Sequence, residues 1–156
     1  MFQYSGLHRI LSTNSSLFEF SLKETNLCSF CNETKLSIFH LFWNCATSRT
    51  FWLELSEKVH NKCNFIISLS ADKVVLGSAT LELSDNMLIV LAKYYIFSCR
   101  LNFPKPFVQG FIKLLKTTNN IVKMSSSWHR SPAVECRIEN KWVKLKKLFT
   151  DTGVSD

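Results

Sequence analysis

Three cysteines and a histidine between residues 28 and 45 constrain the fold of this chain more than any other feature. The pattern is C-x2-C-x8-H-x4-C, formed by Cys28, Cys31, His40 and Cys45. Two thiolates in a C-x2-C turn can reach one ion, and H-x4-C has the spacing of the second ligand pair in structural zinc sites. Four protein ligands leave no position for water, so the pattern predicts a structural Zn2+ site.

A second pair, His60 and Cys63, offers an alternative to His40 and Cys45 as the partner of the C-x2-C turn. We favour the shorter site because closing a shorter loop costs less conformational entropy. The simplest other interpretation is that these are ordinary buried cysteines and a core histidine. Two well-spaced pairs in one short window favour a metal.

The composition is that of a small helical protein. The chain has 156 residues, enough to bury a core without disulfides. Hydrophobic residues make up 46% of it, with 13 phenylalanines, which argues against disorder, and only four glycines and three prolines leave little material for a strand-and-turn sandwich. We expect a mostly α fold: a small helical domain with an N-terminal zinc-organised CCHC loop.

The sequence shows no targeting or membrane segment. The N-terminus lacks a basic start followed by an apolar run, so no secretory signal is predicted. The most apolar stretch, Met87 to Phe97, is interrupted by Lys93 and is too short to cross a membrane. We expect an intracellular protein, nuclear or cytoplasmic and not secreted, whose reduced thiols favour metal over disulfides. A membrane is not an expected partner.

Three segments carry helical patterns. Apolar residues in helical spacing predict a helix over 46–61, and Ser84 caps a nearly all-apolar helix over 85–101. After the break at "NFPKP", a second apolar stripe begins at Phe107, and Ser131-Pro132 predicts the start of a last helix.

Other segments are harder to assign. Residues 35–43 are plausibly helical, whereas 65–70 and 73–77 look extended or irregular. The predicted organisation is a zinc-binding CCHC region with flanking helices at 1–62, an irregular or extended connector at 63–83, and a basic helical region at 84–150.

Positive charge is concentrated in the C-terminal half. The net charge is +7, yet residues 1–60 hold equal numbers of basic and acidic side chains, and residues 93–147 hold twelve Lys or Arg against Glu135 and Glu139. An extended basic surface binds polyanions by releasing their counterions, although such a face also serves solubility alone. The candidate nucleic-acid-binding residues are Lys93, Arg100, Lys113, Lys116, Arg137, Lys141, Lys144 and Lys147.

Several stretches resemble one known family in order and spacing. They are "HRILSTN", "CSFCNET" followed by "HLFWNC", the later "FW", and "NMLIVLAKYYIFSCR" followed by proline and phenylalanine. Together they resemble the C-terminal cysteine-rich segment of LINE-type (non-LTR) retrotransposon polyproteins, the reverse-transcriptase zinc-binding domain, over about residues 7–116. The resemblance implies the same four metal ligands. It also implies a segment that follows an endonuclease and a reverse transcriptase and helps bind nucleic acid during target-primed reverse transcription.

The chain lacks the catalytic parts of such a polyprotein. It contains no paired-aspartate polymerase motif, no endonuclease constellation and no glycine-rich phosphate loop. We therefore expect no enzymatic activity and no small-molecule substrate, and we favour RNA as the partner because zinc knuckles read single strands. The alternatives are a helical scaffold or interaction module that docks on the upstream reverse transcriptase domain, and a non-functional retrotransposon remnant.

Overall fold

The computed structural model is a small, mostly helical protein with a Cys/His cluster near its N-terminal region. It describes residues 12–77, 81–102, 104–126, 136, 139–140 and 142–150. Among these, β pairing is limited to one antiparallel bridge between Leu27 and Lys35. The elements are α2 (Asn14–Glu19), π-helix η1 (His40–Asn44), α3 (Ala46–Cys63), α4 (Ala71–Leu76), α5 (Leu83–Asn102), α6 (Val108–Ser126) and α8 (Lys147–Thr150).

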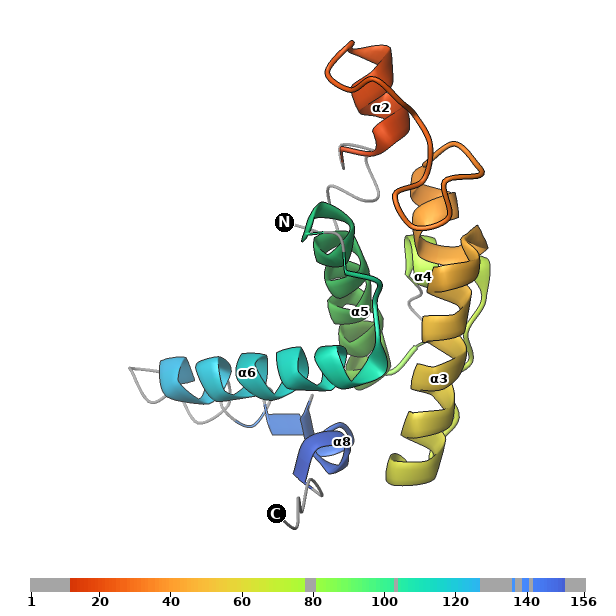
Figure 1. Ribbon diagram of the computed structural model, residues 1–156. Coiled ribbons are helices and arrows are strands. Elements are labelled where there is room, and N and C mark those ends of the chain that lie inside the picture. The colour runs from red at the N-terminus through yellow and green to blue at the C-terminus, as the bar shows by residue number, and fades with distance from the viewer. Residues whose placement is uncertain are drawn as a thin grey trace, which may run out of the picture.

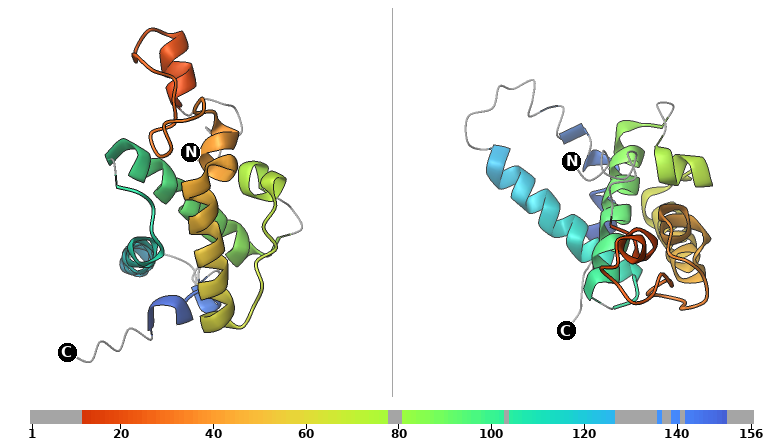
Figure 2. Two further views of the ribbon diagram at one scale, coloured as in Figure 1. Left: turned by 45° about the vertical axis from the view of Figure 1, so that its right-hand side comes forward. Right: turned by 90° about the horizontal axis from the view of Figure 1, so that it is seen from above.

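The long helices α3 and α5 meet through Phe51 and Tyr95, and α6 lies across the lower end of α5 (Figure 1). Helix α8 contacts both α3 and α6 at the lower end of the molecule, while α2 and the loop after it form the upper end. The turned views show the same arrangement, with α4 lying on the flank of η1 and α3 (Figure 2).

An aromatic cluster joins the three long helices. The Phe111 ring of α6 lies 5.7 Å from the rings of both Phe51 on α3 and Tyr95 on α5, and the latter two are 5.9 Å apart. Tilted and edge-on contacts at these separations are the favourable geometry for aromatic rings. Residues of the predicted 1–62 and 84–150 regions therefore share one hydrophobic core.

Helix α3 confirms the pattern that predicted it. Phe51, Trp52, Leu55 and Val59 are all buried and form the stripe that faces α5, α6 and α8. The helix ends at Asn64, whose left-handed backbone (φ 55°) stops the chain from continuing, since asparagine tolerates this conformation better than most residues.

The predicted irregular connector at 63–83 was wrong at its centre, because 71–76 form helix α4. Ser70 caps it by accepting the backbone N–H of Lys73, and Val74 is fully buried against the rest of the protein. Gly77 ends it with φ 82°, a conformation that glycine adopts without strain. A six-residue helix is too short for its apolar spacing to distinguish it from an extended segment.

The two apolar helices of the C-terminal half lie close to their predicted positions. Helix α5 begins one residue before Ser84, and α6 extends the stripe that starts near Phe107 as far as Ser126. The predicted start of the last helix at Ser131-Pro132 lies outside the described residues, as do Val134 and Ile138 of its apolar stripe, but Trp142 and Leu145 are buried as expected. No helix in the described residues is both long and apolar enough to cross a membrane.

Candidate metal centre

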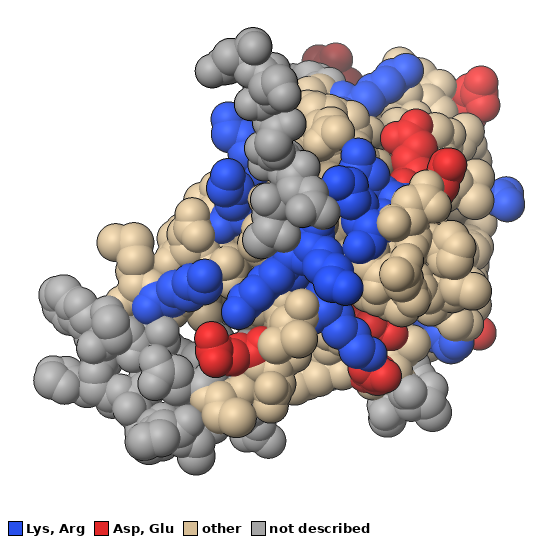
Figure 3. Space-filling model, turned by 90° about the horizontal axis from the view of Figure 1, so that it is seen from below, with Lys and Arg blue, Asp and Glu red and all other residues tan. Residues whose placement is uncertain are grey.

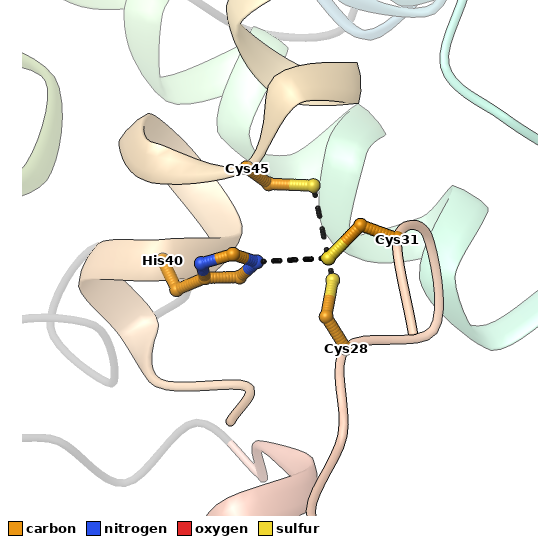
Figure 4. Close-up of side chains that lie close together, drawn as sticks. All are labelled: Cys28, Cys31, His40 and Cys45. Carbon is orange, nitrogen blue, oxygen red and sulfur yellow. Dashed lines mark hydrogen bonds between the residues drawn. The ribbon is translucent and has the colours of Figure 1, made fainter. Parts of the chain in front are cut away.

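The four predicted ligands converge on one point. One ligand atom from each of Cys28, Cys31, His40 and Cys45 lies within 4.8 Å of all the others, and Figure 4 shows the side chains turned toward one another. Two come from the loop before η1, and two from the first residue of η1 and the residue after its end. The structure thus brings together residues that are close enough to hold a metal ion.

Two of the separations match those around a tetrahedrally coordinated ion. The Sγ atoms of Cys28 and Cys45 are 3.8 Å apart, and Cys31 Sγ is 3.5 Å from His40 Nε2. Tetrahedral zinc, with Zn–S of about 2.3 Å and Zn–N of about 2.0 Å, requires S···S separations of about 3.8 Å and S···N separations of about 3.5 Å. The donor set and its spacing therefore fit zinc with four protein ligands.

A tight loop positions the first ligand pair. The Leu27–Lys35 bridge closes it, the Cys28 N–H donates to the Thr34 carbonyl at 2.8 Å, and Asn32 turns the chain with φ 57°. Inside the turn, the Phe30 N–H points at Cys28 Sγ at 3.4 Å. A backbone N–H donated to sulfur stabilises the thiolate that binds metal.

The second ligand pair is positioned by the π-helix. The Cys45 N–H donates to the His40 carbonyl at 2.8 Å, and this i→i+5 bond brings the two residues to the same side of η1. The prediction of a helix over 35–43 was wrong at its beginning, because Lys35 is in the bridge and the first helical residue is 38. π-helical turns are rare, so a sequence pattern does not reveal them.

Buried hydrogen bonds fix η1 to α3. The Trp52 indole N–H donates to the Phe42 carbonyl at 2.7 Å, and the Ser48 hydroxyl donates to the Leu41 carbonyl at 2.6 Å. Both donors are buried on α3, and they satisfy carbonyls that the short π-helix leaves unpaired. The apolar spacing that predicted a helix over 46–61 does not reveal the hydrogen bond from Trp52 to η1, which depends on the tertiary contact.

The surroundings of Cys28 and Cys45 shift the pKa values of the two thiols in opposite directions. The hydrogen bond between the two thiols lowers the pKa of Cys45, with backbone N–H groups at Ser48 and Thr47 acting in the same direction. The same bond, together with burial, raises the pKa of Cys28. These surroundings favour a thiolate at Cys45, and thiolate is the form that binds metal.

The rival pair lies far from the cluster. His60 is exposed near the end of α3, and fifteen helical residues from Cys45 correspond to about 22 Å at the helical rise. Cys63 lies by the basic side chains of Lys62 and Lys147 instead. The metal cluster found among the described residues contains neither His60 nor Cys63.

Two of the predicted nucleic-acid contacts are buried, and those two assignments were wrong. Lys93 is 1% exposed and Arg100 is 5% exposed, so neither presents its charge to a polyanion. The Lys93 ammonium donates to the Val75 carbonyl at 2.9 Å and lies 5.4 Å from the centre of the Phe42 ring. The two residues are seven apart on α5, and at Lys93 that shared stripe is covered by α4 and η1.

The remaining predicted contacts differ in their surroundings. Lys113, Lys116 and Lys147 are exposed. Lys144 pairs with Glu82 and lies 5.6 Å from the centre of the Phe65 ring, so part of its charge is compensated within the protein. Arg137 and Lys141 lie outside the described residues.

Basic side chains gather on one face of the molecule. Figure 3 shows the underside of the view in Figure 1, where Lys and Arg side chains occupy the middle of the face and acidic side chains are fewer. Helix α8 and the C-terminal end of α3 meet at this end of the molecule, and both Lys147 and Lys62 act electrostatically on Cys63 there. Lys62 was not a predicted contact, because only the folded chain brings it beside α8.

The chain matches no family model, no curated protein and no solved structure in comparisons of sequence and fold.

Proposed function

We propose that the four converging residues hold a structural zinc ion. The observation that supports this most directly is the donor set: three sulfur atoms and one imidazole nitrogen, spaced as tetrahedral zinc requires. Thiolate and imidazole ligands favour zinc over magnesium, calcium or manganese, which prefer oxygen. With four protein ligands the ion has no open position, so its role is to organise the loop and not to activate a substrate.

We further propose that the protein is a nucleic-acid-binding module, with RNA as the favoured partner. The basic face supports this, since Lys113, Lys116 and Lys147 are exposed and the surrounding region carries a large excess of positive charge. Lysines on helices provide phosphate contacts, which position a strand without reading its sequence. In this proposal the zinc centre stabilises the N-terminal part of a helical body whose underside binds the backbone.

The resemblance to the cysteine-rich segment of LINE-type retrotransposon polyproteins gives this module a context. In that context the chain holds template or target nucleic acid while an upstream reverse transcriptase performs the chemistry.

Salt dependence tests the nucleic-acid proposal. Binding of a fluorescently labelled single-stranded RNA is measured by anisotropy across a range of salt concentrations, with Lys113, Lys116 and Lys147 all replaced by alanine in one variant. Losing three phosphate contacts should reduce the slope of log K against log salt by about 2. A matched variant with Lys35, Arg49 and Lys58 replaced by alanine removes the same charge elsewhere and should change the slope much less.

Two outcomes contradict the proposal. One is no binding of single-stranded RNA or DNA even at low salt, and the other is equal slopes for the two triple variants. A parallel titration with single-stranded DNA of the same length decides the RNA preference, because only RNA offers 2′-hydroxyl groups.

A second candidate function is docking on the upstream reverse transcriptase domain. Its supporting observation is the apolar end of α2, where Phe18 is 45% exposed and Phe20 and Leu22 are each 73% exposed. Three large apolar side chains so close in sequence form a surface that a partner can bury. Replacing Phe20 and Leu22 by serine should leave RNA binding unchanged and abolish co-purification with that domain if docking is the function.

A further inference from the structure

Helix α5 carries a second buried cation, Arg100, besides Lys93. The protein satisfies only part of the bonding capacity of its guanidinium. Arg100 is 5% exposed, and its guanidinium carbon lies 4.6 Å from the centre of the Phe97 ring. Stacking on an aromatic face engages the π surface of the guanidinium and leaves its N–H donors, which lie in the plane, for other partners.

Two of those donors have none. Arg100 Nε and Nη1 are both buried and make no hydrogen bond. An unsatisfied buried donor on a charged group is among the costlier features of a folded protein. Lys93, on the same stripe, differs because its ammonium donates to the Val75 carbonyl. Arg100 is therefore a buried cation with two donors for which the fold supplies no acceptor.

The nearby metal centre has the opposite deficiency. Three thiolates and a neutral imidazole around a divalent ion carry one net negative charge. Cys28 and Cys45 are completely buried, so water does not compensate that charge at their sulfur atoms. A buried charge is stable only when it is paired or hydrogen-bonded.

Helix α5 packs against η1, the element that carries the ligand His40. Figure 4 shows the ribbon of α5 behind the four ligand side chains. Burial lowers the pKa of Arg100, and the charge of Cys28 acts against that lowering, so this ligand lies within electrostatic reach of the guanidinium.

We infer that Arg100 is the charge partner of the metal centre: its buried guanidinium neutralises the negative charge of the loaded site from the Cys28 side. The inference rests on the proposed zinc site and adds to it a positioning residue that no ligand pattern includes. Residues that support a metal site from outside the ligand set influence its metal affinity.

If Arg100 has this role, the loss of zinc affinity on replacing it should depend on the net charge of the metal centre. Zinc affinity of the full chain is measured by competition with a chromophoric chelator. Arg100→Met, which keeps the length but not the charge or the donors, should weaken binding about 10- to 100-fold. Arg49→Met makes the same change at an exposed position on α3. It should leave the affinity within about twofold, because the contact of Arg49 with Cys45 is a backbone hydrogen bond that the substitution keeps.

A double-mutant cycle separates this electrostatic role from packing. Cys31→His is chosen because Cys31 is less buried than Cys28 and Cys45, and it converts the centre to two thiolates and two imidazoles, which is neutral with zinc. In that background the loss caused by Arg100→Met should shrink to less than about threefold, because there is no net charge left to neutralise. If Arg100 serves only to pack on Phe97, the loss is the same in both backgrounds, and the inference is overturned.

The outcomes distinguish this inference from the zinc proposal. Absence of zinc binding by the unaltered protein overturns the metal site itself. Tight binding by the unaltered protein, with the same affinity in Arg100→Met, overturns only the role of Arg100. Should Arg100→Met fail to fold, Arg100→Gln is measured in the same cycle with the same expectations, since it also lacks the charge but retains an amide donor.

Discussion

The metal-binding segment, residues 26–45, and the helical body of α3, α5, α6 and α8 are held together by different means. The segment contains one isolated bridge, a few turns and a five-residue π-helix, and its most buried side chains include Cys28 and Cys45. In the body, α3, α5 and α6 are helices of 18 to 20 residues joined by the Phe51, Tyr95 and Phe111 rings.

The difference gives the proposed zinc ion its structural role. A long amphipathic helix pays for its own ordering through the apolar stripe that it buries, as α3 does with Phe51 and Leu55. A short loop buries too little to order itself, so a cross-link at its centre supplies the stability. We therefore expect the two regions to respond separately to metal removal and to core mutation.

Removing the metal should have the largest effect, and it should fall on the segment. Structural zinc contributes on the order of 10 kcal/mol to the folding of small sites, so a chelator, or Cys31→Ala, should unfold residues 26–45. Hydrogen exchange measures this: the amides of Cys28 and Leu36, bonded to Thr34 and Asn26, should lose protection, and those of α6 should retain most of theirs.

Cys136→Ala is the matched control for this experiment, because Cys136 is an exposed thiol outside the cluster. It should leave metal content and exchange unchanged. Full protection of the segment in chelator would show that its own packing orders it, and the contrast between the two regions would be lost.

Replacing Phe111 by alanine should destabilise the body and leave the metal in place. Phe111 is fully buried between Phe51 and Tyr95, and removing such a ring costs about 3–5 kcal/mol of unfolding free energy. Denaturant titration of the zinc-loaded protein measures the loss. Phe20→Ala, at a 73% exposed position, should cost much less, and zinc stoichiometry should be unchanged in both variants.

Lys93 lies where the two regions meet and tests the contact between them. Burial lowers its pKa from the ordinary 10.5 to about 8. Between pH 8 and pH 10.5 the unfolded chain therefore binds more protons than the folded chain. The free energy of unfolding is highest above pH 10.5 and decreases by up to about 3 kcal/mol as the pH falls through 8.

Lys93→Met should remove this pH dependence. Unfolding free energies from denaturant titration at pH 7 and pH 10 should rise with pH in the wild type by more than in the variant. Lys116→Met, the same change at an exposed position on α6, should keep the wild-type rise. If the unfolding free energies of wild type and Lys93→Met change with pH in parallel, the Lys93 ammonium is not desolvated where the two regions meet.

Local pattern anticipated much of this protein. The spacing of four ligands predicted a cluster that the fold brings together, and the apolar stripes predicted α3, α5 and the start of α6 close to their observed bounds. Local pattern failed for α4, which is too short for periodicity to identify, and for the π-helical turn between His40 and Cys45. Both elements depend on tertiary contacts: Val74 of α4 is buried against the rest of the protein, and Trp52 donates a hydrogen bond to the π-helix.

The sequence by itself determined the ligand set, the apolar helices and the excess of positive charge, since these follow from spacing and composition along the chain. Tertiary structure alone decided which charges face water. Lys93 and Arg100 share a stripe with apolar residues on α5, and only the packing of other elements, η1 among them, against that helix buries them. The physical reason is that a helical pattern identifies a face, while the neighbours that cover the face come from distant parts of the chain.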